Sequence, residues 1–153
     1  MPFTVSGLSP DPFQPLFGLG DAELAERLAR RVVVDGPGFP ERVEMRDAEP
    51  GETLLLVNFE HQAADTPYRS SHAVYVREGA TRAWKGDHLP PVMQKRLLSL
   101  RGFSADGNMV EADVVEGCSA EPVIERLLGD PRIAYLHAHY AKPGCYAARI
   151  DRA

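Results

Sequence analysis

The chain has 153 residues, of which 44% are hydrophobic and 25% are charged, a balance typical of a globular protein with a buried core. The net charge is −5 and the basic residues are scattered, so the sequence lacks the clustered positive surface that binds nucleic acid through phosphates. No stretch reaches the roughly 18 apolar residues of a membrane span, and the N-terminus does not resemble a signal peptide. We therefore expect a single cytoplasmic domain over residues 1–153, without nucleic-acid or membrane partners.

The first part of the chain predicts short elements separated by loops. A turn of helix is expected within residues 11–17, and a helix over 21–30, which begins with acidic and ends with basic side chains. A valine-rich strand at 31–34 is followed by a loop at 36–40 that contains two glycines and two prolines. Residues 53–60 are almost continuously apolar, as in a central strand covered on both faces.

The second part predicts further strands and two helices. Strands are expected at 73–76, 97–103, 109–115, 132–140 and 145–150, and a short helix at 90–96. Ser119 is expected to cap a second helix, which ends at Gly129. Pro143-Gly144 predicts a type II turn, so the last two strands should be antiparallel. The predicted fold is α+β, with a mixed, mostly antiparallel sheet, two to four short helices and a C-terminal strand–helix–strand–strand unit.

The most informative local feature is His137-Ala138-His139 within an apolar strand. Strand side chains alternate between faces, so the two imidazoles point to the same side. Such a pair can hold a metal ion, move a proton or bind an anion, and it is equally compatible with two structural histidines.

Strand pairing across the Pro143-Gly144 turn predicts which residues share that face. For a two- or four-residue loop, Tyr146, Ile150 and Tyr135 join the histidines, whereas Cys145 and Arg149 lie on the opposite face with Ala138 and Tyr140. A nucleophile–base pair of Cys145 and His139 is therefore disfavoured unless a bulge shifts one strand. Cys118 and Cys145 are expected to be reduced thiols, because two cysteines give neither a disulfide framework nor a metal knuckle.

Two other segments carry polar side chains in apolar surroundings, around residues 58–61 and 67–72. Glu60 and His61 are adjacent, so at most one of them should face the histidine pair. Catalytic candidates are His137, His139, His61, His72 and Glu60; substrate-binding candidates are Arg69, Tyr68, Tyr146 and Asn58. A metal site would use His137, His139 and His72, with His61 or Glu60 as a further ligand. Each of these side chains also has a structural interpretation, such as an ion pair for Arg69 or a loop-end hydrogen bond for His61.

Five sequence blocks together resemble a bacterial domain-of-unknown-function family, number 1203 in its series. They are DAEPG at 47–51, NFEHQ at 58–62, PYRSSH at 67–72, HAH at 137–139 and PGCYAARID at 143–151. The resemblance implies a compact single-domain bacterial protein and brings no established activity. It also implies a Cys-Arg pair where this chain has Glu41-Arg42, so a thiol at that position is not essential here.

Two function classes follow from these residues. One is a small-molecule enzyme, a hydrolase or transferase, in which the histidines act as acid and base, Arg69 holds an anionic group and a divalent metal is optional. The other is a non-catalytic module that binds a small ligand or a metal, or a protein-interaction domain. The chain has no glycine-rich nucleotide-binding motif and no serine-hydrolase elbow, so no nucleotide cofactor is expected.

Overall fold

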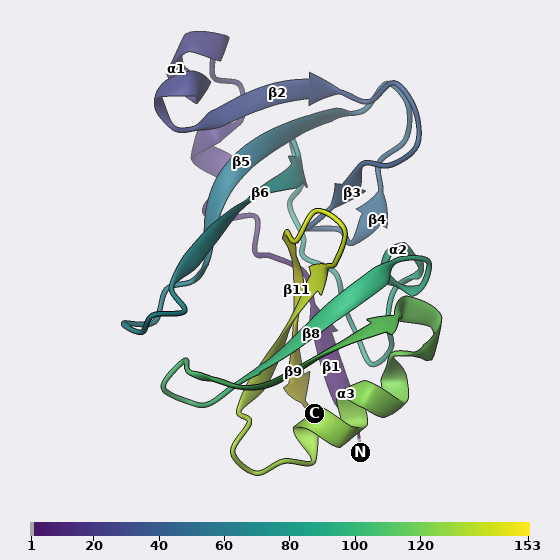
Figure 1. The fold of residues 1–153 in the computed structure, drawn as a ribbon. Coiled ribbons are helices and arrows are strands. Elements are labelled where there is room, and N and C mark those ends of the chain that lie inside the picture. The colour runs from purple at the N-terminus through teal and green to yellow at the C-terminus, as the bar shows by residue number, and fades with distance from the viewer. Residues whose placement is uncertain (1) are drawn as a thin grey trace.

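The computed structural model describes residues 2–153 and contains two β-sheets that face each other (Figure 1). The six-stranded sheet has the order β7-β1-β11-β10-β8-β9, and the five-stranded sheet the order β2-β5-β6-β3-β4. Neighbouring strands are antiparallel except β3 and β6, which are parallel. The strands of the first sheet are β1 (Phe3–Ser6), β7 (Lys85–Gly86), β8 (Leu97–Phe103), β9 (Met109–Glu116), β10 (Tyr135–Tyr140) and β11 (Tyr146–Arg152). Those of the second are β2 (Ala29–Val33), β3 (Pro40–Glu41), β4 (Arg46–Asp47), β5 (Thr53–Gln62) and β6 (Ser70–Arg77).

Short helices complete the fold and confirm the predicted α+β class. They are the α-helices α1 (Asp21–Glu26), α2 (Pro91–Gln94) and α3 (Glu121–Leu128) and the 3₁₀ helices η1 (Gln14–Leu16) and η2 (Gly117–Ser119). The C-terminal unit runs β9, α3, β10, β11 as predicted, although β8 lies between β9 and β10 in the sheet. Within residues 2–153, none of the helices combines the length and the apolar character needed to cross a membrane.

Two predicted helix ends were wrong. The helix expected to reach Arg30 ends at Glu26, because Leu28 adopts a left-handed conformation (φ 55°) and the next residues pair with β5. Tertiary strand pairing therefore overrides the local helical pattern. Ser119 does not cap α3; it belongs to η2, and Ala120 occupies the cap position.

The six-stranded sheet buries a different set of side chains on each face. On one face, Ile124, Leu127 and Leu128 of α3 belong to one buried core with Leu100 and Ala138. The other face looks toward the five-stranded sheet, where Tyr146 joins a second core built mainly from β5 and β6. Alternation along β10 follows from this arrangement, since its alanine and leucine face α3 and its histidines face the opposite sheet.

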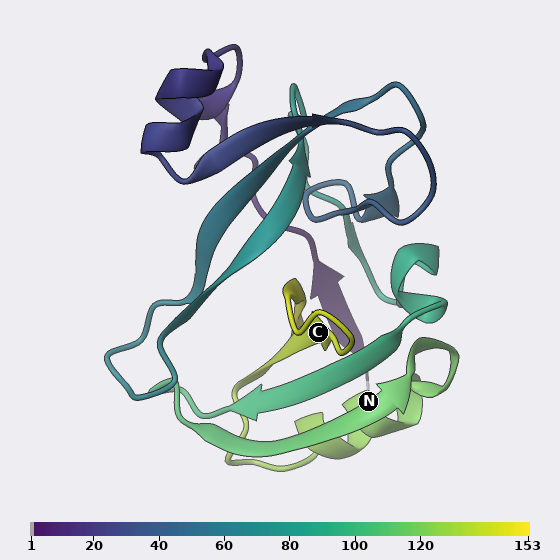
Figure 2. The same cartoon turned by 45° about the horizontal axis from the view of Figure 1, so that its top comes forward.

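The loops of two hairpins join the sheets at one end. In Figure 2 the loop between β5 and β6 reaches the turn between β8 and β9. There the Thr66 hydroxyl donates a hydrogen bond to the carbonyl of Gly107 (3.0 Å).

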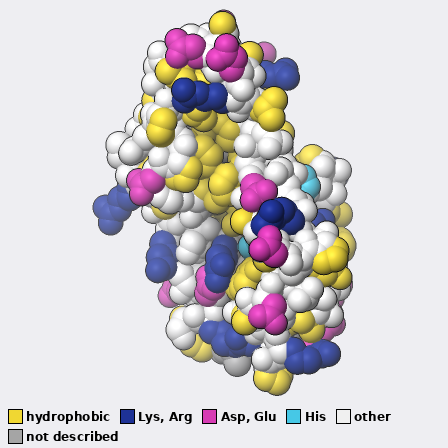
Figure 3. Space-filling model, turned by 90° about the vertical axis from the view of Figure 1, so that its left-hand side faces the viewer, with side chains coloured by type: hydrophobic (Ala, Val, Ile, Leu, Met, Phe, Trp, Pro, Cys, Tyr) yellow, Lys and Arg dark blue, Asp and Glu magenta, His cyan; other side chains and the backbone are white. Residues whose placement is uncertain are grey.

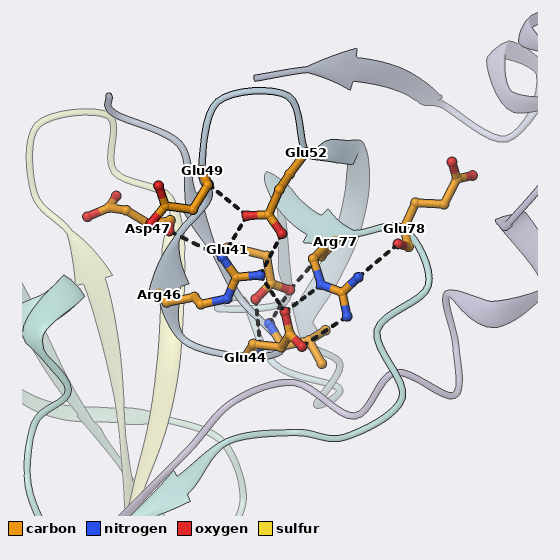
Figure 4. A network of polar contacts seen from close by, with 9 residues as sticks. Glu41, Glu44, Arg46, Asp47, Glu49, Glu52, Arg77 and Glu78 are labelled. Carbon is orange, nitrogen blue, oxygen red and sulfur yellow. Dashed lines mark hydrogen bonds and ion pairs between the residues drawn. The ribbon is translucent and has the colours of Figure 1, made fainter. Parts of the chain in front are cut away.

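Buried polar contacts join the sheets at the other end. Arg42 is 1% exposed and donates to the carbonyl of Tyr146 on β11 (2.8 Å). The segment that carries it is fastened to β6 by the network in Figure 4, in which Glu41 accepts backbone N–H groups of Val43 (2.7 Å) and Arg77 (3.0 Å). The Arg77 side chain pairs with Glu44 in the same network. The two sheets are therefore held in a defined relation, and the histidines lie between them.

Candidate functional site

The structure brings His61, His72, His137 and His139 into one cluster between the sheets. His137 and His139 project from β10, His61 from the end of β5 and His72 from β6. The rings of His61 and His72 are stacked with centroids 4.6 Å apart, and His139 lies 5.0 Å from His61 and 5.2 Å from His72. Four residues that are far apart in the sequence thus share one site.

A bulge in the β10–β11 hairpin sets the composition of this face. The pairing runs Ala138 with Ala148 and then His139 with Tyr146, so Ala147 is the extra residue. Tyr146 lies before this extra residue and packs edge-on against both His137 (5.1 Å) and His139 (5.8 Å), as expected.

The same bulge overturns two of the predicted positions. Arg149 lies opposite His137, on the histidine face, and Ile150 lies opposite Leu136 on the other face. Beyond the bulge each residue of β11 projects to the side opposite the one that uninterrupted pairing predicts. Cys145 lies before the bulge and stays away from the histidines, where the Arg42 guanidinium donates to its sulfur (2.8 Å).

A second bulge lies at His61. Glu60 pairs with Ser71 and Gln62 with Ser70, which leaves His61 as the unpaired residue of β5. Its side chain turns toward the six-stranded sheet, whereas its neighbour Glu60 is exposed. This orientation follows the alternation of β5, because Phe59, two residues earlier, also faces Tyr146.

Hydrogen bonds fix the tautomer of two histidines. The Gly144 carbonyl can only accept, so His139 donates from Nδ1 (3.0 Å) and its buried Nε2 carries the lone pair. The Ser70 hydroxyl donates to the carbonyl of Tyr68 (3.0 Å), so it accepts from Nε2 of His61 (3.3 Å). This leaves the lone pair of His61 on its buried Nδ1, which has no partner among the described residues. We thus assign an unshared electron pair inside the cluster to Nε2 of His139 and to Nδ1 of His61.

The surroundings keep the imidazoles uncharged at neutral pH. Burial is the main cause, and it lowers the pKa of His137 and of His139 to about 3 and that of His61 to about 4. The pKa of His72 is also lowered by burial. The charge of Arg101 acts in the same direction on all four rings, so the site offers neutral nitrogen donors in a positive environment.

Three of the histidines have the arrangement of a metal site. His61, His137 and His139 each present one ligand nitrogen, and these atoms all lie within 4.8 Å of one another. The sequence predicted His72 as the third metal ligand, with His61 or Glu60 as a further one. In the structure His72 stacks on His61 and carries a buried Nδ1 without a partner in the described chain.

Most of the other predicted site residues lie outside the cluster. Tyr146 is part of it, and Tyr68 lies at the rim, where its ring meets Phe103 edge-on (6.3 Å). Arg69 is exposed and pairs with Asp65 (2.6 Å), and the exposed Glu60 projects away from His61.

Asn58 lies on the outer side of the five-stranded sheet. It lines a groove of about 660 Å³ together with Leu28 and Ala73, away from the histidines. Leu28 is 72% exposed, and Figure 3 shows hydrophobic side chains gathered in a band on one face of the molecule.

Sequence reasoning missed Arg101, Ser70 and Gly144, which surround or orient the imidazoles. Arg101 lies directly opposite His137 in the pairing of β8 with β10. Its only local signal is its place between Leu100 and Gly102. These two residues lie on the face of β8 that is covered by α3, so Arg101 lies on the other face. The distant strand that it would face is not readable from that pattern.

Fold and site together define an α+β protein with a neutral histidine cluster between two sheets. The model of the family described as "Protein of unknown function (DUF1203)" matches residues 38–152, and the chain belongs to this family. The matched range includes all four histidines of the cluster. No curated protein and no solved structure matches the chain.

Proposed function

We propose that the protein binds a divalent transition-metal ion, zinc in the first instance, and uses it to activate water for the hydrolysis of a small-molecule substrate. His61, His137 and His139 are the ligands. The observation that carries the proposal is the convergence of their three neutral nitrogen donors within 4.8 Å, from two different sheets.

The donor set fits a catalytic rather than a purely structural zinc site. Structural zinc is usually enclosed by four protein ligands, whereas catalytic zinc commonly has three and keeps a position for water. Bonds of roughly 2 Å hold the nitrogens of a tetrahedral site about 3.3 Å apart, so binding would draw the three rings inward. When bound, zinc lowers the pKa of its water toward neutrality and thereby supplies a nucleophile.

The residues around the ligands support the same role. The Gly144 carbonyl and the Ser70 hydroxyl orient the His139 and His61 rings, as hydrogen-bond acceptors behind metal-bound histidines commonly do. His61 and His72 are half-buried, whereas His137 and His139 are buried, so we expect the cluster to be reached from the side of the first pair.

Acid–base catalysis by the histidines alone is less well supported. Rings with a pKa of about 3 are almost entirely deprotonated at neutral pH, so the acid form needed for proton donation is scarce. The same neutral state is the one that metal coordination requires.

Metal content and metal-dependent turnover test the proposal. The protein is stripped with a chelator, reloaded with zinc and analysed for bound metal, and it is assayed on a panel of small ester and phosphoester substrates before and after reloading. We expect about one zinc per chain and hydrolysis that depends on it. Failure to take up stoichiometric zinc, cobalt, nickel, copper or iron would refute the metal site, and uptake without turnover would identify a metal-binding module instead.

A further inference from the structure

Arg101 is the basic side chain most closely associated with the histidine cluster. It faces His137 across the β8–β10 pair and is half-buried. Its Nε donates to the hydroxyl of Ser99 (3.2 Å), two residues earlier on the same face of β8. Within residues 2–153 its guanidinium forms no ion pair.

Two other arginines at the cluster or its rim differ in this respect. Arg149, which faces His137 from the opposite neighbour β11, pairs with Asp151 (2.9 Å). Arg69 pairs with Asp65 at the rim. The positive charge of Arg101 is therefore left without a protein counter-charge beside the histidines.

Charge balance indicates that the site needs an anion. Three neutral imidazoles leave the two positive charges of a bound metal ion uncompensated, and Arg101 adds a third. Concentrating positive charge in a partly buried site is unfavourable unless an anion accompanies it. A guanidinium also presents paired N–H donors that match the two oxygens of a carboxylate or phosphate.

We infer that Arg101 and the metal together bind one oxyanion group, a carboxylate or a phosphate, of the small-molecule ligand. This inference rests on the proposed metal site and names the substrate class that the site takes. The sequence predicts anion binding by Arg69, whereas our inference assigns it to Arg101 on β8.

Anion titration of the cobalt-loaded protein tests the inference. Cobalt is a visible-light probe of the coordination sphere, and acetate and inorganic phosphate are added in separate titrations to distinguish the two oxyanions. We expect Arg101→Gln to weaken binding of the preferred anion about 10- to 100-fold while cobalt affinity is retained. Arg149→Gln removes a neighbouring arginine that already has a carboxylate partner, and it should leave anion affinity within about threefold.

A second measurement separates the contribution of Arg101 to anion binding from that of the metal. The unfolding midpoint of metal-free wild-type and Arg101→Gln protein is followed as phosphate or acetate is raised at constant ionic strength. Wild type should be stabilised and the variant should not. If cobalt binds but the Arg101→Gln variant takes up anions as wild type does, the role of Arg101 is refuted and the metal site stands. If cobalt does not bind, the proposed function fails, and the metal-free titrations alone decide whether Arg101 binds an oxyanion.

Discussion

Burial keeps the imidazoles of the cluster neutral, and hydrogen bonds fix the tautomer of two of them. The backbone carbonyl of Gly144 accepts a hydrogen bond from Nδ1 of His139, and the Ser70 hydroxyl accepts one from Nε2 of His61. His72 differs because its ring lies flat against His61 rather than completing the trio of donors. The single residues therefore have distinct expected roles.

Alanine substitutions should separate ligands from neighbours. We expect His61→Ala and His139→Ala each to weaken zinc binding at least about 100-fold, because a three-ligand site loses a bond, and His72→Ala to weaken it less than about tenfold. Competition against a chromophoric chelator measures these affinities. His88→Ala is the matched control, since His88 is exposed and pairs with Asp87 away from the cluster. A loss with His72→Ala as large as with His139→Ala would make His72 a ligand.

Stability should fall as the pH is lowered below about 6.5, the ordinary histidine pKa. Burial lowers the pKa of His137 and His139 to about 3 in the folded state, so the unfolded chain takes up protons first and folding is disfavoured in acid. Each ring contributes up to about 1.4 kcal/mol per pH unit between these values.

The pH dependence is measured with chelated protein by urea unfolding between pH 7 and 5, above the range where carboxylates dominate. His137→Gln should reduce the slope relative to wild type. An unchanged slope would show that His137 is not held neutral by burial.

At the scale of elements, two β-bulges and one turn lie next to the site. The bulge at Ala147 brings Arg149 to the histidine face beside Tyr146, and the bulge in β5 lies at His61, whose ring contacts the rings of His137 and His139 on β10. The turn before β11 carries Gly144, whose φ of 79° lies in the left-handed region and whose carbonyl orients His139. The turn thus acts on the cluster through its backbone.

Gly144→Ala should affect both stability and metal binding. Nothing lies within 4 Å of an added Cβ, so the cost comes from the positive φ, and we expect a loss of about 1 kcal/mol in the free energy of unfolding. Zinc affinity should fall as the turn relaxes and the His139 ring loses its acceptor.

Gly38→Ala is the matched control for this turn. Gly38 also has a positive φ (98°) and open space around it, and it lies in a loop away from the cluster. Urea unfolding and chelator competition on both variants give the comparison. Equal effects of the two substitutions on zinc affinity would remove the special role of the Gly144 turn.

At the scale of the whole molecule, the histidines lie where two sheets with separate strand ladders meet. His61 and His72 belong to the five-stranded sheet and His137 and His139 to the six-stranded sheet. Arg42 and the Thr66 contact join the sheets at other points. A metal bound by His61, His137 and His139 would add a cross-link between them.

Zinc should therefore stabilise the fold as a whole. A ligand that binds only the folded state adds about 2.7 kcal/mol at 100 times its dissociation constant. We expect the thermal midpoint to rise with zinc, to fall back with chelator, and to be insensitive to zinc in His61→Ala protein. Calorimetry over a series of zinc concentrations measures this. An equal rise in the His61→Ala variant would place the stabilising ion elsewhere.

The sequence by itself determined the features that depend on local periodicity. The alternation of β10 puts His137 and His139 on one face, adjacency separates His61 from Glu60, and Pro143-Gly144 encodes the return of β11. These follow because strand geometry and turn conformation are set by a few consecutive residues.

Only the tertiary structure decided which side chains surround the histidine pair. It selected His61 as the third donor, placed Arg101 opposite His137 and moved Arg149 to the histidine face. The physical reason is that bulge positions and the pairing of distant strands are fixed by packing across the whole chain. A one-residue shift in either bulge would reverse the faces of the side chains that follow it, and no local pattern in this sequence marks that shift.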